Sequence, residues 1–325
     1  MAKIGVLLVN LGSPNAPTAE ALKPYLKEFL SDRRVVDLPA LLWQPILRGI
    51  ILRKRPARSA ALYAKIWLDA GSPLTVYSTS IQSKLQAWAD SQSLEWQVEL
   101  GMTYGDPSMQ GAMAKLQEQG VDKLVVLPLF PQYSTTTTAA VYDAYERASK
   151  QLGYAPELLA IQDYYAQEQH ISALAKQVET YWQQHGRAEQ LVMSFHGTPQ
   201  ATRAKGDPYY DQCLVTGKAL ADKLGLADDA YRIAFQSRFG YQEWLQPYAE
   251  PMLEDMAKQG VASVQVICPG FAVDCLETLE EVALGFEEAF KAAGGKEFAY
   301  MPCLNDADGQ VEALAALVNS QLAEG

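Results

Sequence analysis

Short apolar runs alternate along the chain with longer segments in which apolar residues recur at helical spacing. A run such as residues 191–195, closed by turn-forming glycine and proline, is typical of a buried strand of a parallel sheet. We expect strands at residues 4–9, 96–102, 123–130, 191–195, 231–236 and 263–268. We expect helices at residues 20–30, 109–119, 141–151, 171–185, 209–224, 248–259 and 311–323. Strands separated by helices form βαβ units, so the pattern predicts an α/β protein.

The alternation occurs in two successive sets, which predicts two Rossmann-like, doubly wound domains, each a parallel sheet flanked by helices. The chain has 325 residues, which is enough for two domains of ordinary size. We place the N-terminal domain at residues 1–165 and the C-terminal domain at residues 166–307. The last helix, within residues 308–325, is expected to pack back on the first domain.

Composition narrows the class of protein. Hydrophobic residues make up 49% of the chain and charged residues 20%, as in soluble globular proteins. The formal net charge of −11 argues against binding of nucleic acid, because phosphate contacts require a basic surface. The four cysteines have no C-x-x-C spacing, so no zinc or iron–sulfur site is expected. Few scattered cysteines, and no run of about 20 apolar residues, favour a cytoplasmic location.

Residues 38–68 have a positive net charge, opposite in sign to that of the whole chain, because this segment contains basic residues and no acidic residue. Its basic residues are Arg48, Arg53, Lys54, Arg55, Arg58 and Lys65. Leucines, isoleucines and Trp43 lie among them. Apolar residues with basic neighbours suit a helix that lies on anionic lipid. They equally suit the mouth of a pocket for a flat, apolar ligand that carries carboxylates, or an amphipathic helix packed on the core.

His196 follows directly after the predicted strand at residues 191–195. Side chains at the carboxyl ends of strands in an open α/β sheet face the crevice in which such folds bind ligands. An imidazole with an ordinary pKa of about 6.5 exchanges a proton near neutral pH and binds metals. His196 is therefore a candidate catalytic residue, unless it only hydrogen-bonds the end of its strand.

Three carboxylates follow the last predicted strand. Asp274 is a plausible N-cap of a helix, and Asp274, Glu277 and Glu281 have the i, i+3, i+7 spacing of one helix face. Like charges in that arrangement raise one another's pKa values, which suits proton carriers. The alternative is a solvated acidic face that is stabilised by the helix dipole.

Several common motifs are absent: there is no P-loop, no G-x-G-x-x-G fingerprint and no G-x-S-x-G elbow. Five segments instead resemble the motifs of the ferrochelatase family, in that family's order and over nearly the whole chain. They are Asn-Leu-Gly-Ser-Pro at 10–14, Pro-Gln-Tyr-Ser at 131–134, Ser-Phe-His-Gly at 194–197, Gln-Ser-Arg at 236–238 and Cys-Pro-Gly-Phe-Ala-Val-Asp-Cys-Leu-Glu-Thr at 268–278.

The resemblance implies a chelatase-like fold with the active site in the cleft between two Rossmann-like domains. It implies a lyase that inserts Fe²⁺ into protoporphyrin IX to form protohaem, the last step of haem biosynthesis. The family's invariant histidine matches His196 and its facing glutamate matches Glu277, both also candidate metal contacts. Asp274 and Glu281 match an acidic helix face that serves as a proton or metal route. Residues 38–68 match the lip that covers the porphyrin and meets the membrane.

Ring contacts are carried over in the same way. The expected substrate-binding residues are Leu11, Arg53, Lys54, Arg55, Tyr104, Ser134, Trp244 and Phe271. Members that use coproporphyrin have a tyrosine where this chain has Leu11, which favours protoporphyrin IX. Three further positions depart from the common pattern: Cys275 replaces a histidine, Thr103 replaces an arginine, and Gly285 ends the acidic face.

The expected partners are thus protoporphyrin IX and Fe²⁺ as substrates, with peripheral contact to an anionic membrane on its cytoplasmic side. No tightly bound cofactor and no iron–sulfur cluster are expected. Two rival functions stay open at this point. One is a cobalt or nickel chelatase of the same fold, and the other is a non-catalytic carrier of tetrapyrrole or metal.

Overall fold

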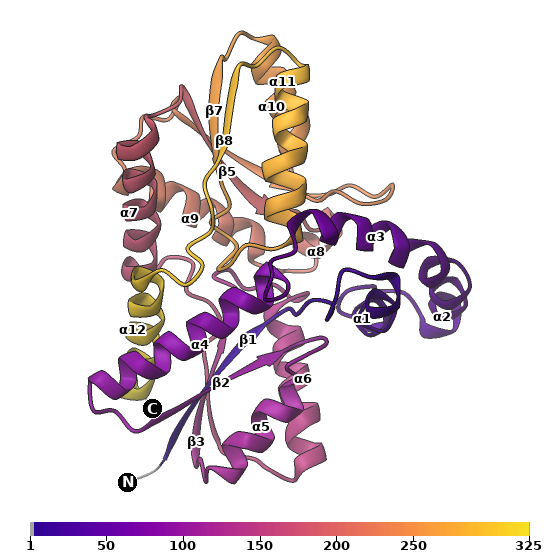
Figure 1. Cartoon of the computed structure of the whole chain (residues 1–325), viewed down its shortest axis with the longest axis vertical. Coiled ribbons are helices and arrows are strands. Elements are labelled where there is room, and N and C mark those ends of the chain that lie inside the picture. Colours follow the sequence, from indigo (N-terminus) through magenta and orange to yellow (C-terminus); the bar gives the residue numbers. More distant parts are fainter. Residues whose placement is uncertain (1–2, 325) are drawn as a thin grey trace. The chain divides into compact units, whose positions relative to one another are not determined.

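The computed structural model describes residues 3–324, and contacts within the chain divide it into two compact units (Figure 1). Unit 1 contains the chain up to Phe130, the segment Ser134–Asp163 and the chain from Leu314 onward. Unit 2 contains Pro131–Tyr133 and Tyr164–Ala313.

Unit 1 is built on a four-stranded parallel sheet in the order β2-β1-β3-β4. Its strands are β1 (Ile4–Asn10), β2 (Trp96–Met102), β3 (Lys123–Pro128) and β4 (Glu157–Ala160). Helices α5 (Met109–Glu118) and α6 (Thr138–Leu152) pack on the face that carries Leu7 and Val126. Helix α4 (Pro73–Ser91) covers the opposite face, and Ser72 caps it by accepting from the Thr75 amide.

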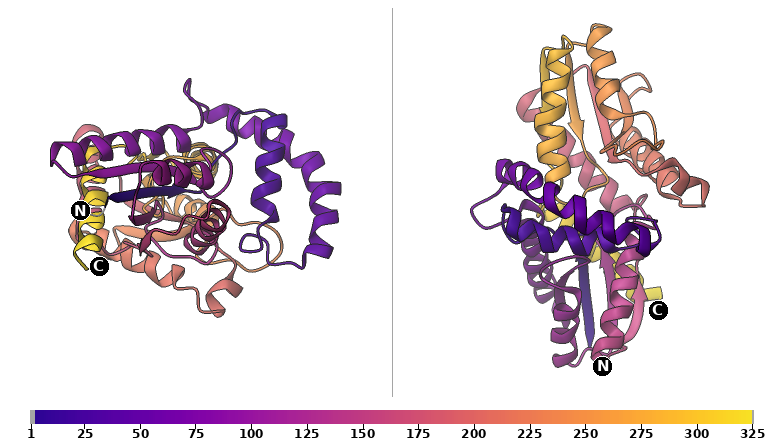
Figure 2. Two further views of the ribbon diagram at one scale, coloured as in Figure 1. Left: turned by 90° about the horizontal axis from the view of Figure 1, so that it is seen from below. Right: turned by 90° about the vertical axis from the view of Figure 1, so that its right-hand side faces the viewer.

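A helical extension of unit 1 stands beyond the carboxyl ends of its strands (Figure 2). It consists of α1 (Ala19–Ser31), α2 (Ala40–Ile46), the π-helix η1 (Leu47–Ile51) and α3 (Leu52–Ile66). Leu22, Leu47 and Leu52 form its small core together with the ring of Tyr104. The acid-free segment is therefore a nearly continuous helix that is fixed to the unit by one side.

Unit 2 repeats the plan with the strand order β6-β5-β7-β8, again all parallel. Its strands are β5 (Gln190–His196), β6 (Tyr231–Gln236), β7 (Ser263–Ile267) and β8 (Glu297–Tyr300). One face packs on α7 (Glu168–His185) and α9 (Tyr209–Lys223). The other packs on α10 (Ala249–Lys258), the π-helix η2 (Glu277–Phe286) and α11 (Glu287–Ala292). The described chain also contains α8 (Gln200–Ala204), in unit 2, and α12 (Asp308–Glu324), which belongs to unit 1 from Leu314 onward.

Two parallel sheets flanked by helices confirm the predicted α/β class with two Rossmann-like folds. Alternation along β5 explains how one strand serves two faces: Met193 and Phe195 belong to one core and Val192 to the other. The sequence prediction missed β4, β8, α4 and the two short helices α8 and α11. Among the described residues, no helix combines the length and apolar character that crossing a membrane requires.

Candidate active site

The order of the strands in unit 2 places a topological switch point at the carboxyl end of β5. From β5 the chain passes to β6 on one side and then to β7 on the other, and α/β folds bind ligands at such a point. His196 is the last residue of β5, one residue beyond the predicted strand, and so lies at the carboxyl end of that strand. Strand β7 leaves the sheet earlier, since its last residue, Ile267, pairs with Met193. The segment that leads to η2 therefore starts beside the end of β5.

His196 is half-buried, and its hydrogen bond defines which ring nitrogen is available. Its Nδ1 lies 2.6 Å from the carbonyl oxygen of Gly197. Because a carbonyl oxygen can only accept, Nδ1 carries the proton and donates it. In the neutral ring the lone pair then lies on Nε2, which can take a proton or bind a metal ion.

Two aromatic residues named from the sequence lie near His196. The ring centroid of Phe271 is 6.4 Å from that of His196. The ring of Trp244 lies against Gly197, where a methyl group would come within 3.3 Å of its Cε3 atom. Unit 2 thus brings together an imidazole and two large apolar rings, as a site for a flat aromatic ligand requires.

Glu277 and Glu281 both lie on η2, and both are half-buried. A π-helix has i→i+5 hydrogen bonds and wider turns than the 3.6 residues of an α-helix, so residues four apart lie closer to one face. The Glu281 carboxylate accepts from the Ser237 amide at 2.6 Å and from the Ser237 hydroxyl at 2.5 Å.

The pKa of Glu281 is raised above the ordinary glutamate value, chiefly because burial disfavours the charged carboxylate. The hydrogen bonds from Ser237 and the positive charge of His196 oppose that rise, and the charge of Glu277 adds to it. The prediction of a raised carboxylate pKa is therefore confirmed for Glu281, although burial and not repulsion between carboxylates is the main cause. A carboxyl group of this kind is suited to carrying a proton.

Asp274 does not share that helix face, and this prediction is wrong. It precedes η2, and its side chain is only 3% exposed. Its Oδ1 accepts from the Tyr300 hydroxyl at 2.5 Å, from Thr278 Oγ1 at 3.0 Å and from the Cys303 amide at 3.3 Å. Its Oδ2 accepts from Asn305 Nδ2 at 2.7 Å. It is not the N-cap either, since the residue before η2 is Leu276. Donors on several segments draw this carboxylate inward, because a buried charge needs such partners.

Cys275, at a position where the resemblance led us to expect a histidine, is buried. Burial and the neighbouring Glu277 carboxylate raise the pKa of its thiol, so it stays protonated near neutral pH. Among residues 3–324, no three His, Cys, Asp or Glu side chains are grouped as a metal site would require. Metal contact by His196 and Glu277 stays a prediction.

The site residues predicted in unit 1 lie in four places, one of which is α3 with Arg53, Lys54 and Arg55. Leu11 directly follows β1 and is half-buried. Ser134 is buried in the turn after β3 and accepts from the Thr136 amide at 3.2 Å. Tyr104 is a core residue, because its ring packs edge-on against Phe29 and its hydroxyl donates to Asp32 at 2.9 Å. Its contact with a porphyrin stays a prediction.

The acid-free segment carries a second, solvent-exposed apolar side. Leu41 is 91% exposed, Leu42 65% and Ile50 57%. Arg53 and Lys54 are exposed on the following turn, and Arg55 is half-buried. Packing on the core accounts for Leu47 and Leu52 but not for this exposed side.

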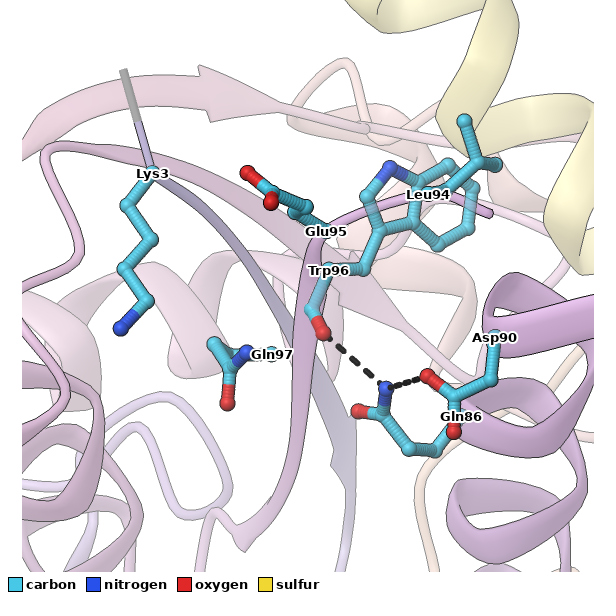
Figure 3. Close-up of a pocket in the computed structure, with 7 residues that line it drawn as sticks. All are labelled: Lys3, Gln86, Asp90, Leu94, Glu95, Trp96 and Gln97. Carbon is cyan, nitrogen blue, oxygen red and sulfur yellow. Dashed lines mark hydrogen bonds between the residues drawn. The ribbon is translucent and has the colours of Figure 1, made fainter. Parts of the chain in front are cut away.

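A pocket of about 420 Å³ lies elsewhere, at the amino-terminal ends of β1 and β2 (Figure 3). It is lined by Lys3, Gln86, Asp90, Leu94, Glu95, Trp96 and Gln97. Gln86 Nε2 donates to the carbonyl oxygen of Trp96 at 3.0 Å and to Asp90 Oδ1 at 2.8 Å. None of the predicted site residues lines this pocket, so it is not the candidate active site.

Gln236 and Ser237 contact the site glutamates, and the sequence analysis gave them no role. Their position at the end of a predicted strand next to that of His196 was the available signal. What the sequence did not reveal is the left-handed backbone of Ser237, whose φ is 66°.

Comparison with known proteins identifies the family of this chain. The model of the family described as Ferrochelatase matches residues 3–322. Ferrochelatase 1 of Shewanella oneidensis is 51% identical over 321 residues, which cover 98% of this chain and 95% of that protein. The ferrochelatase of Vibrio cholerae is 50% identical over 316 residues, which cover 97% of each chain. The solved structure of SirB from Bacillus subtilis with Fe³⁺ has a TM-score of 0.60 and 10% identity, covering 99% of this chain and 96% of that one. That structure supports the fold alone, whereas the sequence matches show that this chain belongs to the ferrochelatase family.

Proposed function

We propose that this chain inserts Fe²⁺ into protoporphyrin IX to form protohaem, with release of two protons, as a lyase of haem biosynthesis. The observation that carries the proposal is the family match over residues 3–322, together with ferrochelatases about half identical over nearly the full length. The same matches do not favour a cobalt or nickel chelatase or a non-catalytic carrier.

The reaction requires two pyrrole N–H protons to leave and the hydrated metal ion to lose water. Nε2 of His196 is free to accept a proton or to guide the metal, since Nδ1 is occupied by Gly197. Glu277 acts on the opposite face of the ring, with Glu281 behind it as a proton carrier. Asp274 precedes η2 and is buried among donors from other segments, so its role is to hold the loop that leads to η2.

One imidazole and one carboxylate are a weak ligand set for Fe²⁺, and weak binding suits an ion that has to pass to the porphyrin. The four cysteines are not part of this set. We propose that the enzyme works without an iron–sulfur cluster, because the four cysteines are scattered along the sequence and none has C-x-x-C spacing.

The porphyrin contacts follow from the chemistry of the ring. Its flat apolar body suits Leu11, Phe271, Trp244 and Tyr104, and its two propionates suit Arg53, Lys54, Arg55 and Ser134. Leu11 in place of a tyrosine favours protoporphyrin IX over coproporphyrin.

An anaerobic assay of protoporphyrin IX with Fe²⁺, followed by the absorbance of the metalloporphyrin, tests the proposal. His196→Ala and Glu277→Gln should each lose most of the activity while the circular dichroism spectrum is unchanged. His185→Ala is the matched control, because His185 is exposed at the end of α7. Porphyrin binding without metal insertion by the wild-type protein would contradict the enzymatic function, and full activity of both site variants would contradict the site.

We further propose that the exposed side of α2 and η1 contacts an anionic membrane on its cytoplasmic face. Exposed leucines next to exposed basic residues support this, because burial of apolar area and attraction to anionic lipid then act together. Leu41→Asp should weaken co-sedimentation with phosphatidylglycerol vesicles, and Val215→Asp, on an exposed apolar residue of α9, should not. Equal binding of both variants and the wild type would refute the contact.

A further inference from the structure

The end of β6 lies directly beside the candidate catalytic histidine. His196 and Gln236 are register partners in the parallel ladder between β5 and β6. The ladder continues past the strand, because the Gly197 amide donates to the Gln236 carbonyl oxygen at 2.8 Å. Ser237, which follows Gln236, is therefore held in a fixed position relative to the backbone of His196.

Gln236 also ties η2 to this strand end. Its side chain is 2% exposed, and Nε2 donates to the carbonyl oxygen of Glu277 at 2.8 Å. Its Oε1 accepts from the Ser194 hydroxyl at 2.7 Å. A carbonyl oxygen accepts only, so the contact with Glu277 decides which way the amide points. One side chain thus links β5, β6 and the first turn of the π-helix.

Ser237 contacts the next turn of the π-helix through both of its donors. The amide approaches Oε1 of Glu281 and the hydroxyl approaches Oε2, so a single residue engages both carboxylate oxygens. Charge-assisted hydrogen bonds to both oxygens restrict rotation of the carboxylate more than one bond would. The backbone of Ser237 is left-handed, with φ of 66°.

That backbone conformation favours glycine, since a Cβ atom is strained there. Among residues 3–324, eleven glycines have positive φ, but only Ser93, Ser237 and Asn305 do so without being glycine. Glycine at position 237 would relieve the strain and keep the amide, but it would lose the hydroxyl. The chain therefore has a strained serine at position 237, and the hydrogen bond from its hydroxyl is the contact with Glu281 that glycine could not make.

We infer that Ser237 is a positioning residue, which holds the carboxylate of Glu281 in the orientation that its role beside His196 and Glu277 requires. The inference rests on the proposed function and deepens it. Ser237 acts only through Glu281, so its loss should lower kcat and leave the KM for porphyrin unchanged. A misplaced catalytic group can cost about 100-fold in rate, and we expect Ser237→Ala to lower kcat about tenfold or more.

A double-mutant cycle in the anaerobic insertion assay separates positioning from a general structural role. In a Glu281→Ala background there is no carboxylate to hold, so Ser237→Ala should have no further effect on kcat. Ser237→Gly is the second variant, because it relieves strain and so preserves folding while it removes the hydroxyl. It should lower kcat as Ser237→Ala does. Ser93→Gly is the matched control, since Ser93 is an exposed left-handed serine in unit 1, and its kcat should equal that of the wild type.

Three results would overturn the inference: additive effects in the cycle, wild-type kcat in Ser237→Gly, or an effect that falls on KM alone. Failure of the proposed function is a different result, because the wild-type protein itself would then form no metalloporphyrin.

Discussion

Replacement of Asp274 by asparagine should destabilise unit 2, although the side chain keeps its size. The carboxylate accepts four hydrogen bonds at 3% exposure. In Asp274→Asn, the new carbonyl oxygen can replace Oδ1 and keep its three donors. The new NH₂ group then faces Asn305 Nδ2, which is also a donor. Asn305 cannot simply turn its amide around, because its Oδ1 accepts from the Asp274 amide at 2.8 Å.

The expected loss of stability follows from the number of donors that are left without an acceptor. A buried donor without an acceptor costs about 1–3 kcal/mol, and the loss of charge weakens the bonds that remain. We expect Asp274→Asn to lower the free energy of unfolding by about 2–3 kcal/mol. Asp274→Ala leaves all four donors without their acceptor, so we expect a loss of at least about 4 kcal/mol. Exchange of the two residues, in Asp274→Asn with Asn305→Asp, restores an acceptor opposite the new NH₂ group and should recover about 1 kcal/mol or more.

The measurement has to report on unit 2 alone, because two units need not unfold together. Hydrogen exchange of β5 and β7 amides as a function of urea gives that local free energy of opening. Asp228→Asn, on an exposed aspartate of the same unit, is the control and should change stability by no more than about 0.5 kcal/mol. The reasoning is refuted if Asp274→Asn matches this control, or if the double exchange recovers no stability.

Three further outcomes are expected. Burial lowers the pKa of His170 from 6.5 to about 4, so the unfolded chain binds the proton first and stability falls between about pH 6.5 and 4, by about 3 kcal/mol in total. When the free energy of unfolding is measured by urea titration at several pH values, His170→Leu should lack this decrease. A decrease equal to that of the wild type would contradict the assignment. Gly12→Ala should lower the melting temperature severely, because φ is 103° and the new methyl would lie 1.8 Å from the carbonyl oxygen of Tyr104. Gly217→Ala should cost about 1–3 kcal/mol, since its methyl would meet a movable end of Ile233 at 2.4 Å, and equal melting temperatures for the two variants would contradict this ranking.

How well each strand was predicted depends on how clear its apolar pattern is. β2 and β6 were predicted to their ends, because buried runs stop at turn residues. β4 and β8 were missed since they are four-residue edge strands in which every side chain but that of Leu159 is exposed or half-buried, and such short strands give a weak apolar signal. α4 was missed although Leu74, Ile81 and Leu85 recur at helical spacing and are buried on one face of the helix.

The site was predicted less completely for a different reason. The position of His196 depends on the end of a strand, which the local sequence encodes. The separation of Asp274 from Glu277 and Glu281 depends on where η2 begins and on its π geometry. Helical spacing assumes 3.6 residues per turn, so it could not distinguish the two arrangements. The donors that draw Asp274 inward, Tyr300 and Asn305, lie more than twenty residues away in the sequence.

The carboxylates of Asp274 and Glu281 are each bound by a residue with a left-handed backbone. Of the non-glycine residues with positive φ in the described part of the chain, Ser237 holds Glu281 and Asn305 holds Asp274. A left-handed backbone costs about 1–2 kcal/mol for a residue with a side chain, less for asparagine than for serine. Hydrogen bonds to a charged group are worth about 1.5–3 kcal/mol each, so each contact can offset the strain that it requires. Asn305 binds the buried carboxylate of Asp274, which is 3% exposed, and the gain there is stability. Ser237 binds a half-buried carboxylate beside His196, where glycine would fold with less strain, so the gain there is the orientation of Glu281.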